Sequence, residues 1–100
     1  MKYEFEIYQT EAMYAFMKYD FAKENGFNQS DYEFCCSSTL EATCEEEVLE
    51  IIWGIFNADD RPFRREMRSL SVSDVVVING KAYYCDPFGW YEINWRRDWQ

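Results

Sequence analysis

The most informative segment of the sequence is residues 73–85, which read SDVVVINGKAYYC. Strand-forming residues stand on both sides of Asn79-Gly80, and this dipeptide is typical of the type I′ turn, whose two central residues need a positive φ. The segment therefore predicts a β-hairpin. Residues 86–89, DPFG, predict a second turn and residues 90–93, WYEI, a further strand, so we expect an antiparallel three-strand meander.

Two segments nearer the start of the chain show the alternation of a half-buried strand. Residues 3–8, YEFEIY, alternate apolar side chains with carboxylates, and residues 31–36, DYEFCC, repeat the pattern. We expect the buried side chains to be Tyr3, Phe5 and Ile7 in the first strand and Tyr32, Phe34 and Cys36 in the second. A sheet built from these two strands and the meander has about five strands, mostly antiparallel.

Residues 11–25 predict a helix between these strands, with Thr10 as its N-cap and Gly26 just after its last turn. The large apolar side chains of this helix fall on two nearly opposite sides. One side holds Ala12, Phe16 and Tyr19, and the other holds Tyr14, Met17 and Phe21. Either the domain covers this helix on two sides, or one aromatic face is left for a partner. A second copy of the chain is one such partner, which would make a homodimer.

Residues 43–56 predict a second helix. Thr43 and Glu46 fit a capping box, and the acidic residues near them suit the positive end of a helix dipole. The helix is amphipathic, with Val48, Ile51, Ile52, Ile55 and Phe56 in one arc and Glu46, Glu47, Glu50 and Gly54 in the opposite one. Residues 57–70, NADDRPFRREMRSL, show no periodicity and predict a connecting loop.

These elements predict an α+β fold, a mostly antiparallel sheet of about five strands with two helices packed on it. The 100 residues suffice for one domain, residues 1–100, and no apolar run approaches the roughly 18 residues of a membrane helix. The opening residues, MKYEFEIYQT, alternate charged with apolar residues, whereas a signal peptide would have an apolar stretch there. We therefore expect a soluble, cytoplasmic domain that does not enter a membrane.

The charge of the chain, −9 in total, is distributed unevenly. Residues 1–60 carry 14 acids and 3 bases, a net charge of −11, whereas residues 61–100 carry 5 acids and 7 bases, a net charge of +2. Acidity of this kind repels nucleic-acid phosphates, so it favours either solubility alone or binding to a basic surface on another protein. The candidate partner-binding face comprises Glu46, Glu47, Glu50, Asp59 and Asp60.

The basic residues support an alternative function, which is nucleic-acid binding by arginines beside aromatic rings. The basic candidates are Arg61, Arg64, Arg65 and Arg68 in the loop, Lys81 in the hairpin, and Arg96 and Arg97 near the C-terminus. The aromatic candidates beside them are Trp90, Tyr91, Trp95 and Trp99. The same arginines can instead pair with the acidic first half of the chain, which would neutralise both sets of charges.

The sequence offers little for catalysis or metal binding. It has no histidine, and its four cysteines, Cys35, Cys36, Cys44 and Cys85, lack a CxxC spacing, so we expect buried, reduced thiols. Asp74 and Asp86 flank the hairpin and either cap its turns or form a carboxylate pair that holds a metal ion or shares a proton. Turn capping is the simpler role, so we expect no catalytic residues, no metal, no cofactor and no enzyme activity.

A recognisable series of short motifs runs along nearly the whole chain. It comprises Phe5-x-Ile7-Tyr8, Phe16-Met17-x-Tyr19, Tyr32-Glu33, Ile55-Phe56-Asn57, residues 68–77 (RSLSVSDVVV) and residues 80–89 (GKAYYCDPFG). This series resembles the YodL-like domain family, most specifically over residues 68–89. The chain departs from the family pattern in residues 61–67, RPFRREM, which are richer in arginine, and in Cys85, where valine is more usual.

The resemblance implies a biological context and assigns no catalytic residues. Small proteins of this family are carried by plasmids and conjugative transposons of Gram-positive bacteria, alone or fused to larger DNA-handling proteins. Combined with the net charge of −11 in residues 1–60 and the two-faced aromatic helix expected over residues 11–25, this context predicts a small acidic protein-interaction module of a mobile genetic element. We expect it to bind or block a basic, nucleic-acid-handling partner.

A second, more local resemblance involves residues 70–76, LSVSDVV. They are similar to an element of small barrels and PUA-like nucleic-acid modules in which glycine usually precedes the aspartate, whereas Ser73 stands there in this chain. Ser71, Ser73 and Asp74 either start the following strand by accepting backbone hydrogen bonds or hold a ligand.

Overall fold

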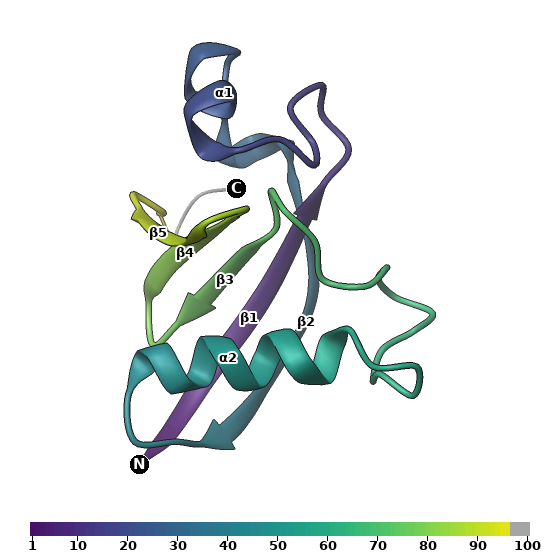
Figure 1. Cartoon of the computed structure of the whole chain (residues 1–100), viewed down its shortest axis with the longest axis vertical. Coiled ribbons are helices and arrows are strands. Elements are labelled where there is room, and N and C mark those ends of the chain that lie inside the picture. Colours follow the sequence, from purple (N-terminus) through teal and green to yellow (C-terminus); the bar gives the residue numbers. More distant parts are fainter. Residues whose placement is uncertain (97–100) are drawn as a thin grey trace.

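The structure is a computed structural model that describes residues 1–96 (Figure 1). Its elements in chain order are β1 (Lys2–Thr10), α1 (Tyr19–Glu24), the 3-10 helix η1 (Gln29–Asp31), β2 (Tyr32–Glu41), α2 (Glu45–Phe56), β3 (Val75–Ile78), β4 (Lys81–Asp86) and β5 (Gly89–Ile93). The strands form one antiparallel sheet in the order β2-β1-β3-β4-β5. The predicted α+β fold, with a five-stranded antiparallel sheet and two helices, is confirmed.

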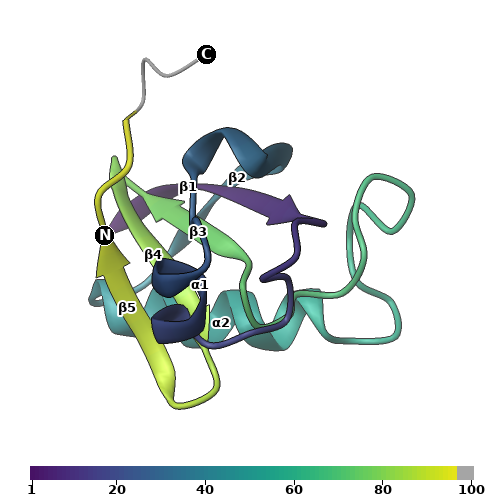
Figure 2. The same ribbon diagram turned by 90° about the horizontal axis from the view of Figure 1, so that it is seen from above.

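Two clusters of buried side chains lie on the two faces of this sheet. Strand β3 contributes to both, because successive side chains of a strand point to opposite faces: Val76 and Ile78 join one cluster, Val75 and Val77 the other. Helix α2 crosses the first face, which we call the α2 face (Figure 1). Helix α1 and its flanking segments contribute to the cluster on the second, the α1 face. Figure 2 shows the loop after α2 extending away from the sheet.

The predictions for β1 and for the hairpin are confirmed. Tyr3, Phe5 and Ile7 are all buried in β1. The turn between β3 and β4 has a φ of 47° at Asn79 and 90° at Gly80, both positive as a type I′ turn requires. Strand β5 follows β4 in the expected meander.

The predicted burial of Phe34 is wrong, because its side chain is 57% exposed. A β-bulge divides the ladder between β1 and β2: Ile7 pairs with Cys36, whereas the next residue, Tyr8, pairs with Phe34. The extra residue, Cys35, reverses the alternation of the strand. Cys36 therefore stays buried on the α2 face, while Phe34 packs edge-on against Tyr8, with ring centroids 5.6 Å apart.

The predicted helix over residues 11–25 is wrong in its first half, because α1 begins only at Tyr19. The Thr10 hydroxyl accepts the backbone N–H of Ala12 at 3.1 Å and starts a turn instead of a helix. Phe16 has a φ of 68°, which no right-handed helix accommodates. The predicted end is correct, since α1 ends at Glu24 and Gly26 adopts a positive φ of 87°.

Long-range hydrogen bonds explain why this segment is not helical. The backbone N–H of Phe16 donates to Ser73 Oγ at 2.9 Å, and that of Tyr19 donates to Asp86 Oδ1 at 2.8 Å. These amides therefore bond to side chains far along the chain instead of to the preceding turn. The expected two-faced helix does not form: Tyr14 is buried, whereas Phe16 is 59% exposed.

The second predicted helix is confirmed, with its cap one residue later than expected. Cys44 is the N-cap of α2, so the capping box predicted for Thr43 and Glu46 is out of register. Glu47 takes the acidic role instead, because its carboxylate accepts the backbone N–H of Thr43 at 2.9 Å.

The buried arc of α2 is rotated slightly from the predicted one. Its buried residues are Val48, Leu49, Ile52 and Phe56, whereas Ile55, expected in the core, is 43% exposed. The predicted loop over residues 57–70 contains no regular helix or strand, and its Phe63 stacks on Phe56. Within residues 1–96, no helix is both long and apolar enough to cross a lipid bilayer.

Candidate protein-binding face

Helix α2 and the turn after it present carboxylates to solvent. Glu46 and Glu50 are exposed one helical turn apart, and Asp59 and Asp60 are exposed just after the helix. Glu47, the fifth predicted residue, is partly buried, and its carboxylate accepts the backbone N–H of Thr43 before the helix. We refer to the four exposed residues, Glu46, Glu50, Asp59 and Asp60, as the acidic face.

The acidic face is not neutralised by ion pairs in the described part of the chain. The ion pairs of residues 1–96 join Met1 to Glu41, Asp20 to Lys23, Arg68 to Asp74 and Lys81 to Glu45. None of these pairs includes a residue of the acidic face. Because Glu46 and Glu50 stand at positions i and i+4 and repel each other, a cation placed near both would stabilise them.

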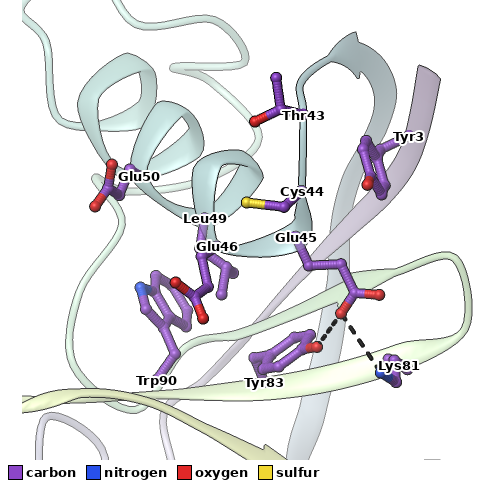
Figure 3. Close-up of a pocket in the computed structure, with 10 residues that line it drawn as sticks. All are labelled: Tyr3, Thr43, Cys44, Glu45, Glu46, Leu49, Glu50, Lys81, Tyr83 and Trp90. Atoms are coloured by element: carbon purple, nitrogen blue, oxygen red, sulfur yellow. Dashed lines mark hydrogen bonds and ion pairs between the residues drawn. The ribbon is translucent and has the colours of Figure 1, made fainter. Parts of the chain in front are cut away.

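A groove of about 830 Å3 lies between the first half of α2 and strands β4 and β5 (Figure 3). Its lining residues are Tyr3, Thr43, Cys44, Glu45, Glu46, Leu49, Glu50, Lys81, Tyr83 and Trp90. Figure 3 shows Trp90 reaching from β5 toward Glu46 and Leu49 on the helix, and the Tyr83 hydroxyl turned toward Glu45. The groove therefore has aromatic side chains on its sheet side and carboxylates on its helix side.

Glu45 fixes one end of the groove. Its carboxylate accepts a short hydrogen bond from the Tyr83 hydroxyl and lies 3.6 Å from the Lys81 ammonium. Burial raises the pKa of Tyr83, and the hydrogen bond to Glu45 and the negative charges of Glu45, Glu92 and Glu46 raise it further. Tyr83 is therefore a protonated donor at neutral pH, and the charges acting on it make this end of the groove electronegative.

A second hollow, of about 450 Å3, adjoins the groove at Trp90. Trp90 and Glu50 line both hollows. Trp53 lines only the second and packs edge-on against Trp90, with ring centroids 6.5 Å apart. A partly exposed indole thus stands where the two hollows meet, next to a carboxylate without an ion pair in residues 1–96.

The predicted nucleic-acid-binding residues of the loop are not equivalent. Arg68 donates two hydrogen bonds to the buried carboxylate of Asp74, at 3.0 and 2.9 Å, so its charge is compensated inside the chain. Arg61 is partly buried, and Arg64 and Arg65 are exposed. Only the last two present uncommitted guanidinium groups to solvent among the four loop arginines.

Of the C-terminal candidates, Trp90 lies on the α2 face, where the loop also packs, whereas Trp95 and Arg96 are not brought together with the loop arginines. Trp95 packs against Tyr8, with ring centroids 5.1 Å apart, in the cluster of the α1 face, whereas the loop packs on the α2 face. Arg96 is exposed, and its backbone bonds to Gln29. Arg97 and Trp99 lie outside the described residues.

Asp74 and Asp86 have separate donors and do not bond to each other. The Asp74 carboxylate accepts from Arg68, from Gln9 Nε2 at 2.9 Å and from the Ser71 backbone N–H at 2.7 Å. Asp86 accepts two backbone N–H groups. Burial raises the pKa of Asp74, whereas the hydrogen bonds and charge of Arg68 oppose that rise. Both carboxylates hold the chain ends of the hairpin in place.

The cysteines are free thiols. Cys36 and Cys85 are buried as expected, and burial raises the pKa of each to about 12, so both are protonated and poorly nucleophilic at neutral pH. Cys35 is only partly buried and Cys44 is exposed, contrary to expectation. Among residues 1–96, no three His, Cys, Asp or Glu side chains come together as a metal site.

The acidic residues of this region are predictable from the sequence, but the groove is not. From the sequence, Tyr83 is expected only as a strand residue of the hairpin, and Trp90 as a nucleic-acid-binding candidate. The missed signal is the alternation of residues 90–93, which places Trp90 and Glu92 on one face of a strand and Tyr91 on the other.

The family model of the YodL-like domain matches residues 4–95. This range contains both helices and β2 to β5 entirely, and most of β1. No curated protein and no solved structure significantly matches the chain. The match covers more than nine tenths of the sequence, and the chain belongs to the YodL-like domain family.

Proposed function

We propose that this chain is an acidic interaction module that binds a basic protein partner through the acidic face, and that it is not an enzyme. One observation carries the proposal: Glu46, Glu50, Asp59 and Asp60 are exposed and have no ion pair within residues 1–96. Exposed charges of one sign attract a partner of the opposite sign and accelerate its encounter.

The proposed partner is a basic, DNA-handling protein, the class of partner that the expected mobile-element context would supply. A protein carried by a plasmid or conjugative transposon meets DNA-handling proteins in the cytoplasm, and their DNA-binding surfaces are rich in Lys and Arg. The acidic face offers carboxylates where DNA would offer phosphates. The module then binds such a surface and blocks it.

Nucleic-acid binding by this chain has weaker support. Arg64 and Arg65 are exposed, but Asp59, Asp60 and Glu66 share their loop and would face the phosphates too. Arg68, which would complete the basic patch, is already paired inside the chain.

The test is affinity capture from a bacterial host of the chain at low salt, with captured proteins identified by mass spectrometry. We expect a basic, DNA-handling protein to be recovered with the unmodified chain. The quadruple variant Glu46→Gln, Glu50→Gln, Asp59→Asn and Asp60→Asn removes the charge of the acidic face and should reduce this recovery by about tenfold or more.

A matched control removes four exposed carboxylates elsewhere, by Glu4→Gln, Glu11→Gln, Glu24→Gln and Glu33→Gln. Its net charge equals that of the quadruple variant, and recovery should be close to that of the unmodified chain. Equal recovery with both variants would contradict the proposal, and binding of a labelled DNA or RNA probe that depends on Arg64 and Arg65 would favour the nucleic-acid alternative.

A further inference from the structure

The two edge strands of the sheet differ in how readily they can pair with another strand. Strand β2 carries the bulge at Cys35, and such bulges discourage further pairing. Strand β5 pairs with β4 in a regular ladder from Gly89 to Ile93, and it contains neither Lys nor Pro. Within residues 1–96, no strand lies on its outer side. The outer edge of β5 therefore offers backbone N–H and C=O groups to an extended peptide.

The side chains of β5 show which way an added strand would point its own. Trp90 packs toward the α2 face and lines the groove, whereas Tyr91 packs against Tyr19 on the α1 face, with ring centroids 6.0 Å apart. Glu92 alternates with Tyr91, and its charge acts on Tyr83 beside the groove. A strand added next to β5 would likewise direct every second side chain to the groove side, about 7 Å apart.

The chemistry of the groove selects basic side chains. Glu46 and Glu50 line it without an ion pair, while Lys81, its one cationic lining residue, is already paired with Glu45. The indole of Trp90 offers an apolar surface to the stem of a Lys or Arg side chain and a π-face to its charged head. An acidic side chain in the same place would be repelled by these carboxylates.

We infer that β5 and the groove bind an extended basic segment of a protein partner, which adds to the sheet as an edge strand. Its alternate Lys or Arg side chains lie between Trp90 and the carboxylates of Glu46 and Glu50. This inference rests on the proposed function and deepens it, because it requires an extended segment where the proposed function requires only a basic surface.

The test uses a labelled peptide of three Lys-Val repeats, titrated into the full chain at low salt and followed by fluorescence anisotropy. A second peptide of the same sequence carries N-methyl groups on its valine amides, and a third carries them on its lysine amides. We expect one of these to bind about tenfold more weakly, because it cannot complete the ladder. Hydrogen exchange should slow at Gly89–Ile93 and stay unchanged at Tyr32–Glu41, the other edge.

The charge requirement is tested with the double variant Glu46→Gln and Glu50→Gln, which should weaken peptide binding by about tenfold. Glu11→Gln with Glu24→Gln removes the same charge from exposed positions outside the groove and should leave binding unchanged.

The outcomes separate the inference from the function on which it rests. Binding that needs Glu46 and Glu50 but tolerates both N-methylated peptides, or that slows exchange at β2, overturns edge pairing and leaves the acidic face as a charge-based site. Peptide binding that is absent, or that is the same in both double variants, overturns the inference. If recovery of the partner in the capture experiment does not depend on the acidic face, the proposed function itself is overturned.

Discussion

The two faces of the sheet are covered in different ways. On the α2 face, a regular 12-residue helix packs aliphatic side chains over the strands. On the α1 face, a six-residue helix and irregular segments contribute mainly rings. Tyr14, Tyr19, Phe27, Tyr32 and Tyr84 form contacts there with centroids 4.9 to 6.4 Å apart.

The difference shows what each cover requires from the rest of the chain. A helix satisfies most of its own amides, so α2 is held mainly by apolar burial, with the contacts of Glu45 to Tyr83 and Lys81 at its first residue. The irregular cover of the α1 face needs outside partners: the Tyr84 hydroxyl donates to the Met17 carbonyl at 2.7 Å, and the Tyr32 hydroxyl donates to the Ser73 carbonyl at 2.6 Å. The α2 face thus depends on packing, and the α1 face on buried polar contacts as well.

Phe56 tests how far the α2 face depends on packing. Phe56 is 2% exposed and packs edge-on against Phe5 and face-on against Phe63. Phe56→Ala leaves a cavity under the helix, so we expect the free energy of unfolding to fall by about 4 kcal/mol in urea denaturation. The neighbouring Ile55→Ala, at an exposed position, should change it by less than about 1 kcal/mol, and equal losses would contradict a packing role specific to the buried arc.

Alkaline pH should act mainly on the α1 face. Burial raises the pKa of four tyrosines there, Tyr14, Tyr19, Tyr32 and Tyr84, and of Tyr83 on the α2 face. The pKa of Tyr14 rises to about 12. Between about pH 10 and pH 12, the unfolded chain loses a proton at this residue that the folded chain keeps, so stability falls as pH rises, by about 2 kcal/mol for Tyr14 alone.

The measurement is the urea midpoint as a function of pH, with tyrosinate absorbance recorded in parallel. Tyr14→Phe should lower stability at neutral pH, since it loses the bonds to Asn28 and Asp31, yet make the alkaline decline shallower. Ile55→Ala, which changes no titratable group, should leave the slope unchanged. A slope that is the same in all three proteins would show that Tyr14 does not titrate in the way described.

The parts of the fold that depend on local features are predictable from the sequence. The period of β1 and the Asn79-Gly80 turn are local features, and both were predicted correctly. The amphipathic helix α2 was also predicted, with its buried arc slightly rotated from the observed one. The acidic residues of α2 were predicted as well, because a solvated helix face follows from its period. The groove was not, because it requires the relative placement of α2 and β5.

The failures come from contacts between residues distant in sequence. Residues 11–18 have the composition of a helix, but the Phe16 amide bonds to Ser73, just before β3, and the amides of Ala15 and Met17 form only short local turns. Phe34 has the right period for burial, and a single bulge residue, Cys35, moves it to the other face. Neither a long-range hydrogen bond nor a bulge leaves a periodic signal in the segment that it changes.

Replacing Ser73 tests whether the irregular cover of the α1 face depends on a buried hydrogen bond. Ser73 is buried at a φ of 85°, and its Oγ accepts the Phe16 backbone N–H. Ser73→Ala keeps the unfavourable φ and removes the acceptor, so we expect a loss of about 1.5 kcal/mol. Ser73→Gly removes the same acceptor but relieves the left-handed backbone, which is worth about 1 kcal/mol, so its stability should lie close to that of the unmodified chain. Equal losses would mean that the strained turn costs nothing, and no loss in either variant would mean that the irregular cover of the α1 face does not depend on this hydrogen bond.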